Sequence, residues 1–362
     1  MARVHLRDLG YRIGNLQPGQ YNAITDVAGV KVGHVTIIKD QPQVLRTGVT
    51  VILPHSGNIT DQNCFGGSHV LNGNGEVTGL SFLNDFGRIH TPIALTGTYS
   101  VGAVHEGLVK AEIISDASAD FKLPIVAETH DGWLSTGSAL AVRPEHVLEA
   151  LNNCKTGPVA EGNVGGGTGM ICHDFKGGVG TASRLPIVDE QTFCVGVYVQ
   201  ANYGRRQRLL LEGIPVGRLL PGEKVPLCRK RGRGSGSIII VIATNAPLLP
   251  HQLKSMARRA GIGLGRVGGL GETSSGDIFL AFSTANILPA WGRGSFNDVR
   301  MMQEDLTTPL YDAVVEATEE AIWNALCMAE TMQGRQGRMC HAIPLDRLQD
   351  IIKHYGGFKL DG

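Results

Sequence analysis

A serine stands where a polar, glycine-rich loop meets a strongly apolar segment. Ser237 follows Gly236 and precedes the run Ile-Ile-Ile-Val-Ile-Ala. A serine hydroxyl is a poor nucleophile unless a base accepts its proton. If the chain is cut between Gly236 and Ser237, the new α-amine can be that base, because its pKa of about 7.7–8.0 leaves part of it neutral near pH 7. Gly236 allows the backbone torsions that an attack on its own carbonyl would require.

This local pattern does not settle the chemistry by itself. Gly-Ser before a strand is common, so a purely structural Ser237 stays open at this point, and Ser235 also follows a glycine. Residues 263–268 match GxGxxG, but we expect them to follow a helix and precede a strand, the reverse of a dinucleotide site. The glycine run at 165–169 lacks the lysine of a phosphate-binding loop and predicts close backbone packing.

The sequence indicates no metal or cofactor site. It contains no GxSxG, HExxH or CxxC pattern, and its seven cysteines are scattered. We therefore expect all seven to be free, mostly buried thiols in a reducing cytoplasm. The equal numbers of basic and acidic residues, 33 each, argue against binding to nucleic acid. We expect no membrane association, because no apolar run is long enough to span a bilayer and the start lacks a signal peptide's apolar core.

Apolar periodicity predicts the elements that must position Ser237. Alternating or continuous β-branched residues predict strands at 49–53, 193–199, 238–243 and 278–282. Helical spacing between prolines and glycines predicts helices at 144–151, 250–260, 309–333 and 344–355. No linker divides the chain, so we expect one layered α/β or α+β domain over residues 1–362. The basic tract 229–233 is interpreted as an exposed connection.

Several ordered motifs resemble the family of L-aminopeptidase D-Ala-esterase/amidases and its β-peptidyl aminopeptidase relatives. They span nearly the whole chain, at residues 22–34, 48–54, 128–132, 162–170, 236–247 and 275–284. The resemblance implies an α+β fold, a four-layer αββα sandwich similar to N-terminal-nucleophile (Ntn) hydrolases but with different connectivity. It also implies self-cleavage, no cofactor or metal, and a homotetramer of cleaved protomers.

The resemblance assigns roles to individual positions. It places the cut between Gly236 and Ser237, which gives fragments 1–236 and 237–362 and favours Ser237 over Ser235 as nucleophile. Ser275 and Asp277 match the hydroxyl and carboxylate that bind the nucleophile's hydroxyl and amine. A carboxylate beside an α-amine would orient it and stabilise its charged form.

Three further positions match residues that would contact the substrate. Asn202 matches the amide donor of the oxyanion hole, which acts by stabilising charge that develops in the transition state. Glu128 matches the acid that holds the substrate's free amino group, so an internal peptide bond would not be recognised. His130 stands where some relatives have a tyrosine whose hydroxyl assists the oxyanion; a histidine N–H could do the same or only shape the pocket.

We therefore expect a serine aminopeptidase or amidase that releases small N-terminal amino acids from peptides, amides or esters through an acyl-enzyme on Ser237. A β-peptidyl aminopeptidase or a nylon-oligomer amidase on the same fold is the alternative, and an acyltransferase is a remoter one. A third hypothesis is a binding protein that kept the fold and lost the chemistry. It is disfavoured because Ser237, Asn202, Ser275, Asp277 and Glu128 are all present.

Overall fold

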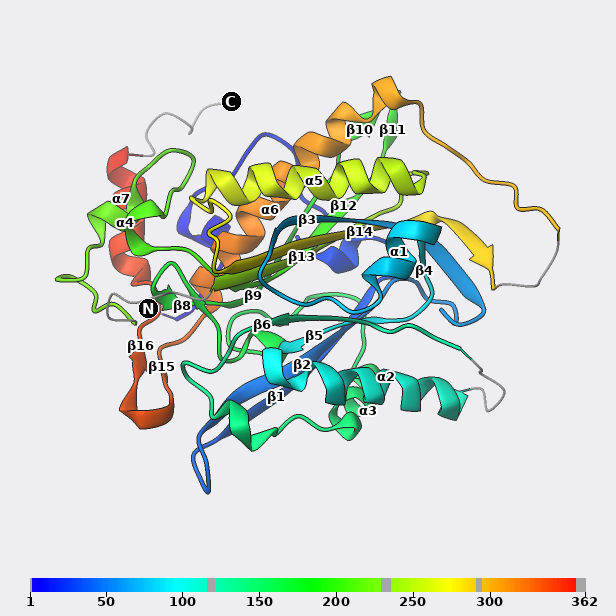
Figure 1. Ribbon diagram of the computed structural model, residues 1–362. Helices are drawn as coiled ribbons and strands as arrows, with labels where there is room; N and C mark the ends of the chain where they lie inside the picture. The colour runs from blue at the N-terminus through cyan, green and yellow to red at the C-terminus, as the bar shows by residue number, and fades with distance from the viewer. Residues whose placement is uncertain (1, 116–120, 229–235, 291–294, 356–362) are drawn as a thin grey trace.

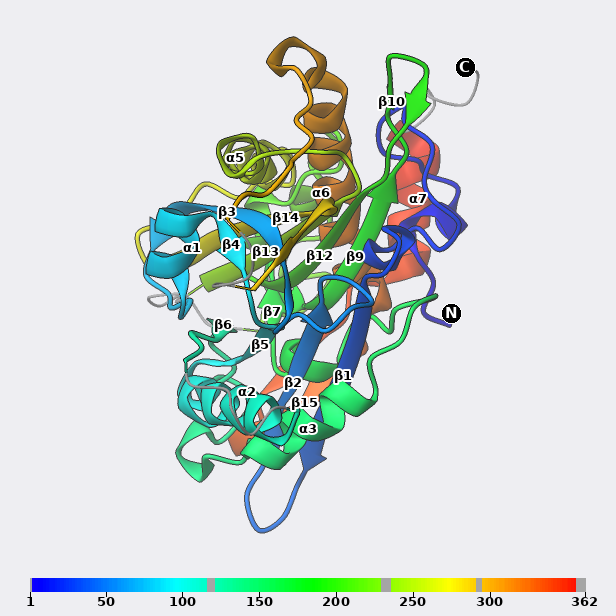
Figure 2. The same ribbon diagram turned by 90° about the vertical axis from the view of Figure 1, so that its right-hand side faces the viewer.

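The computed structural model describes residues 2–115, 121–228, 236–290 and 295–355. Two β-sheets lie face to face between two helical layers, which is the αββα arrangement that the motifs predict (Figures 1 and 2). The basic tract 229–233 and Ser235 lie outside the described residues.

The four-stranded sheet has the order β1-β2-β5-β6. Its strands are β1 (Lys31–Lys39), β2 (Leu45–Leu53), β5 (Ile93–Gly97) and β6 (Ile125–Thr129). Helices α2 (Val101–Ser115) and α3 (Pro144–Asn152) cover its outer face. The apolar side chains between this sheet and its helices include Val49, Val51, Val104 and Val147.

The six-stranded sheet has the order β4-β3-β14-β13-β12-β9. Its strands are β3 (Gln62–Gly73), β4 (Arg88–Ile89), β9 (Gly178–Arg184), β12 (Val195–Asn202), β13 (Gly236–Thr244) and β14 (Ser275–Pro289). Helices α5 (Pro250–Arg266) and α6 (Thr308–Met328) cover its outer face. Strands β13 and β14 are parallel, and the other neighbouring pairs are antiparallel.

Shorter elements complete the described chain. They are α1 (Leu80–Phe86), β7 (Ile171–Cys172), β8 (Phe175–Lys176), β10 (Ile187–Val188), β11 (Gln191–Thr192), α4 (Val216–Leu219), β15 (Met332–Gln333), β16 (Met339–Cys340) and α7 (Leu345–Tyr355). No helix in the described ranges is long and apolar enough to cross a membrane.

The apolar run after Ser237 becomes the central strand β13, which is buried on both faces. Ile238, Ile240 and Ile242 pack toward helices α5 and α6, whereas Ile239 and Val241 pack toward the other sheet. A strand covered on both sides requires a continuous apolar sequence rather than an alternating one. The strands on either side of β13 and β14 come from the part of the chain before Ser237, so the two parts interleave within one sheet.

Two helix boundaries differ from the sequence prediction. Helix α5 continues past Gly261 to Arg266, so the GxGxxG residues end this helix instead of following it. Gly263 lies where α5 approaches α6, and a Cβ there would come within 2.7 Å of the Thr318 Cβ. Glycine is tolerated because close helix packing compensates for its low helix propensity. Helix α6 ends at Met328, and Met332 belongs to β15 instead.

The cysteines also differ from the prediction. Cys228 and Cys340 form a disulfide, and the other five, Cys64, Cys154, Cys172, Cys194 and Cys327, are free. The two partners are 112 residues apart in the sequence. No spacing motif could reveal such a pair, because the fold brings it together. Seven free thiols was therefore the wrong expectation.

Candidate active site

Ser237 lies near the start of β13, between strands β12 and β14. Its partner in β12 is Asn202, and its partner in β14 is Gly276. The hydroxyl of Ser237 donates to the carbonyl oxygen of Gly236 at 2.6 Å and accepts the N–H of Gly276 at 3.3 Å. The side chain is 4% exposed, so the sheet holds the hydroxyl beside the carbonyl that it would attack in self-cleavage.

Ser275 and Asp277 follow the start of β14, beside Gly236. The Ser275 hydroxyl donates to Asp277 Oδ1 at 2.5 Å, and both side chains are buried. Burial raises the pKa of Asp277 to about 6, although the hydrogen bonds from Ser275 and the backbone of Ile238 oppose that shift. Gly236, Ser275 and Asp277 line a small pocket, together with Tyr203, Gly204, Arg208 and residues 268–272. The Asp277 carboxyl group therefore borders this pocket together with Gly236.

Asn202 ends β12 and is fully buried. Its Oδ1 accepts the N–H of Ile171 at 2.9 Å, and its Nδ2 donates to the carbonyl of His130 at 3.1 Å. The donor on Oδ1 and the acceptor on Nδ2 fix which way the amide points. Because Asn202 pairs with Ser237 in the sheet, the amide nitrogen is held near the candidate nucleophile.

Glu128 lies in β6, on the opposite sheet, and is 3% exposed. Its Oε1 accepts the N–H of Glu76 at 3.1 Å, and its Oε2 accepts the hydroxyl of Thr98. Burial raises its pKa. Among the described residues, no basic side chain forms an ion pair with this carboxylate. A buried carboxylate in that state gains most from an ammonium group supplied by a ligand.

Two glycines separate Glu128 from Ser237 at the junction of the sheets. A Cβ on Gly75 would lie 3.0 Å from the Gly276 Cα and 3.3 Å from Glu128 Oε1. The same Gly276 donates its N–H to Ser237. The carboxylate and the hydroxyl thus lie on opposite sides of a close contact between the backbones of Gly75 and Gly276.

His130 is joined to the site through its backbone, because its carbonyl accepts the Asn202 amide. Its ring meets the Tyr99 ring edge-on, with centroids 6.0 Å apart. Sequence reasoning missed Thr98, Gly75 and this backbone contact. Thr98 follows β5 directly, and the parallel pairing of Thr96 with Glu128 in β6 brings it close; only knowledge of that pairing would have exposed it. The described residues contain no cluster of His, Cys, Asp and Glu suited to a metal.

Comparison with known proteins places this arrangement in a family. Residues 22–340 match Peptidase family S58. The sequence is 43% identical over 365 residues to a protein named beta-peptidyl aminopeptidase BapA from Sphingosinicella microcystinivorans, with 96% of this chain and 92% of that protein covered. This chain belongs to peptidase family S58.

Solved structures agree. A Burkholderia sp. beta-aminopeptidase superposes with a TM-score of 0.92 at 48% identity, covering 98% of this chain and 99% of that one. The L-aminopeptidase D-Ala-esterase/amidase from Ochrobactrum anthropi, described as a new variant among the Ntn-hydrolase fold, superposes with a TM-score of 0.89 at 42% identity, covering 97% and 99%. The S58 chain is thus a hydrolytic aminopeptidase, and the predicted Ntn-like αββα fold is confirmed.

Proposed function

We propose that this S58 aminopeptidase activates itself by cutting the bond between Gly236 and Ser237. The Ser237 hydroxyl attacks the Gly236 carbonyl carbon, and the acyl group moves from nitrogen to oxygen. Water then hydrolyses the ester, which leaves a carboxylate on Gly236 and an α-amine on Ser237. The observation that carries this proposal is the placement of the hydroxyl on the Gly236 carbonyl at 2.6 Å, in a buried strand.

In the cut enzyme, the α-amine of Ser237 accepts the hydroxyl proton as the oxygen attacks the substrate carbonyl. Asn202 Nδ2 donates to the developing oxyanion, in competition with its bond to His130. The amine then gives the proton to the leaving group, and water releases the acid from the acyl-enzyme. Asp277, with Ser275 bound to it, orients the amine and favours its charged form.

Glu128 would bind the substrate's terminal ammonium, with Thr98 and Glu76 holding the carboxylate in place. We propose substrates that are small N-terminal amino acids joined to peptides, amides or esters. The names of the relatives make β-amino acids candidates as well as α-amino acids. A panel of alanine p-nitroanilide, β-alanine amides and acetylornithine separates these options; activity only in acceptor-dependent transfer would identify an acyltransferase instead.

Intact mass and N-terminal sequencing test the proposal directly. We expect fragments 1–236 and 237–362 and a second N-terminus that reads Ser-Ile-Ile-Ile. Ser237→Ala should remain uncut and lose at least about 10⁴-fold in kcat, as removal of a catalytic serine does elsewhere. Ser235→Ala is the matched control and should be cut normally. Normal cleavage and activity in Ser237→Ala would assign the nucleophile to another residue.

We propose a homotetramer of cut protomers in the cytoplasm, tested by light scattering and by cell fractionation. In that location the Cys228–Cys340 disulfide would be an exception, because disulfides are rare in reducing compartments. Recovery of the protein in a secreted fraction would contradict the cytoplasmic location. A monomer in light scattering would contradict the tetramer.

A further inference from the structure

The disulfide joins the two parts of the chain that the proposed cut would separate. Cys228 precedes the Gly236–Ser237 bond by eight residues, and Cys340 lies in β16, well after it. The interleaved strands already hold the two parts together in the folded protein. In the folded protein, the disulfide therefore acts locally: it restrains the residues that contact Cys228 and Cys340.

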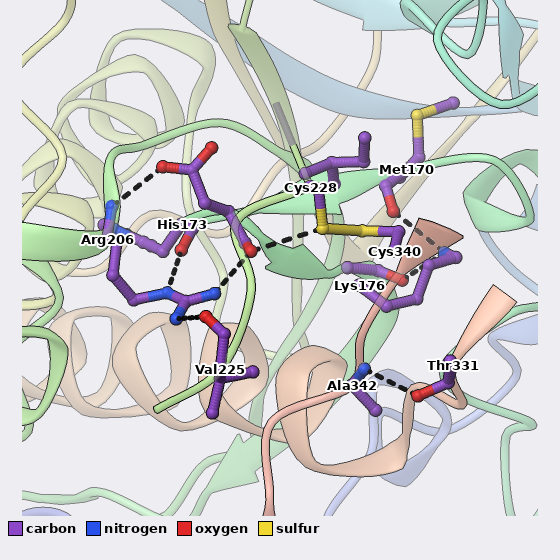
Figure 3. Close-up of a disulfide and its surroundings, with 12 residues drawn as sticks. Met170, His173, Lys176, Arg206, Val225, Cys228, Thr331, Cys340 and Ala342 are labelled. Atoms are coloured by element: carbon purple, nitrogen blue, oxygen red, sulfur yellow. Dashed lines mark hydrogen bonds between the residues drawn. A yellow bond between two sulfur atoms is a disulfide. The ribbon is translucent and has the colours of Figure 1, made fainter. Parts of the chain in front are cut away.

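The neighbour of the disulfide is the hairpin of β7 and β8, whose strands pair at Ile171–Lys176 and Cys172–Phe175. The Cys228 sulfur lies 3.2 Å from the carbonyl oxygen of Asp174, in the hairpin turn (Figure 3). On the other side, the backbone N–H of Lys176 donates to the carbonyl of His341, the residue after Cys340, at 2.8 Å. The segments that contain Cys228 and Cys340 thus both contact the β7–β8 hairpin.

Arg206 reinforces the same contact from inside. Its guanidinium donates to the carbonyls of His173 and Asp174 in the turn and to that of Val225 in the segment leading to Cys228 (Figure 3). It also donates to the carbonyl of Leu220 in the same segment. The side chain is 2% exposed, so these bonds have little competition from water. The segment that ends at Cys228 is therefore connected to the hairpin turn through Arg206, and the disulfide joins its last residue to β16.

The hairpin in turn sets the orientation of Asn202. Ile171, at the start of β7, donates its N–H to Asn202 Oδ1, and His173 donates its backbone N–H to Tyr203, the residue after Asn202, at 2.7 Å. The turn residues His173 and Asp174 have φ values of 50° and 57°, positive at both positions as a two-residue type I′ hairpin turn requires. The contacts of this turn with Arg206 and Cys228 therefore act on a defined two-residue loop.

We propose that the Cys228–Cys340 disulfide is a positioning element for Asn202, which it holds through the β7–β8 hairpin, and that it keeps the two fragments covalently joined after the cut. The inference rests on the proposed self-cleavage and on the proposed role of Asn202. Breaking the disulfide removes the covalent restraint on Cys228, and the hairpin turn then loses a fixed neighbour at Asp174. The amide donor is then less well oriented, whereas Glu128, on the other sheet, is unaffected.

Thiol counting and electrophoresis test the covalent part on the full chain, purified without reductant. After denaturation, alkylation should label five of the seven cysteines, and all seven once the disulfide is reduced. The cut protein should run as one species without reductant and as two fragments with it. Cys340→Ser should separate into fragments without reductant, whereas the matched control Cys154→Ser should stay joined.

Steady-state kinetics on alanine p-nitroanilide test the positioning part. We expect Cys340→Ser to lower kcat about 3- to 10-fold with KM unchanged, a fraction of the 10²–10³ that loss of an oxyanion donor costs. If that variant folds poorly, reduction of the folded wild-type enzyme by a phosphine, which transfers two electrons to the disulfide, should give the same kinetic change. Cys154→Ser should keep wild-type kinetics.

The outcomes separate this inference from the proposed function. Seven labelled cysteines before reduction, or fragments that separate without reductant, would overturn the cross-link while leaving self-cleavage intact. An unchanged kcat after reduction would overturn the positioning role. A single species both with and without reductant would instead overturn self-cleavage, and the thiol count would still decide the disulfide.

Discussion

The two sheets contribute differently to the candidate site. The six-stranded sheet presents Asn202, Ser237, Ser275 and Asp277 from three adjacent strands, so sheet register fixes their relative positions. The four-stranded sheet presents Glu128, held by a threonine hydroxyl and a backbone N–H. The first arrangement suits bond making and breaking, and the second suits recognition of a charged end. Separate supports of this kind should allow kcat and KM to be changed independently.

The largest effect is expected on the six-stranded sheet. Asn202→Ala removes the donor to the oxyanion, which should lower kcat about 10²–10³-fold with little change in KM. Kinetics on alanine p-nitroanilide measure it, with thermal unfolding to show that the variant folds. An equally large fall in kcat in Glu128→Gln would contradict the separate roles of the two sheets.

A smaller effect is expected on the four-stranded sheet. Glu128→Gln keeps the shape and one acceptor oxygen for the Glu76 N–H, and its NH2 can donate to the Thr98 hydroxyl, but the charge is lost. A hydrogen bond to a charged group contributes about 1.5–3 kcal/mol, so KM should rise about 10- to 100-fold with kcat near the wild-type value. N-acetylated substrates, which lack the ammonium, serve as the control. The preference for free over N-acetylated substrates should be smaller in the variant than in the wild type. If the preference is unchanged, the carboxylate does not bind the amino group.

The pH dependence of stability should report the burial of Asp277 on the six-stranded sheet. The folded pKa of Asp277, about 6, lies above the ordinary value of 3.8, so the folded state holds this proton more tightly than the unfolded state does. The resulting stabilisation is complete below about pH 4 and is lost as the pH rises through 6.

Asp277→Asn cannot ionise, so it should gain up to about 2–3 kcal/mol relative to the parent between pH 4 and pH 8. Urea unfolding in the uncut Ser237→Ala background measures this gain. The same comparison at pH 4 is the internal control. If the difference in the free energy of unfolding between the two proteins does not vary with pH, burial does not raise the pKa of Asp277.

The smallest effect is expected for the ring of His130, since its connection to Asn202 runs through the backbone. His130→Phe keeps that carbonyl and removes only the ring N–H. If the ring assists the oxyanion by one neutral hydrogen bond, kcat should fall about 2- to 10-fold. A loss as large as that of Asn202→Ala, measured on the same substrate, would make the ring a main oxyanion donor instead.

Local sequence was sufficient for the strands nearest the site. The continuous run after Ser237 could only suit a strand covered on both faces, and the residues at 193–199 showed the alternation of β12. Helix ends were harder, because Gly261 packs toward Phe279 of β14 and Gly263 packs against α6, and local helix propensity contains neither contact. The disulfide, Thr98 and Gly75 were beyond reach for the same reason. Each depends on which distant strands lie side by side.

The candidate site residues came from motifs rather than from periodicity. Without the resemblance, Asp277 would have been interpreted as an aspartate in a turn or at the cap of a strand. The structure places Asn202, Ser275 and Asp277 on the two strands that flank the strand of Ser237. It also links His130 to Asn202 through a carbonyl, a contact that residue types alone cannot indicate.

Strands β13 and β14 lie between β3 and β12, so a cut at Gly236 would change how the protein can refold. Before the cut, the sheet forms within one chain. After a cut at Gly236, two strands of one fragment would be inserted between strands of the other, and recovery from complete unfolding without a cross-link would require two chains to meet. Such an enzyme would persist because it unfolds slowly, not because it refolds easily. Its working lifetime would then be set by its rate of unfolding.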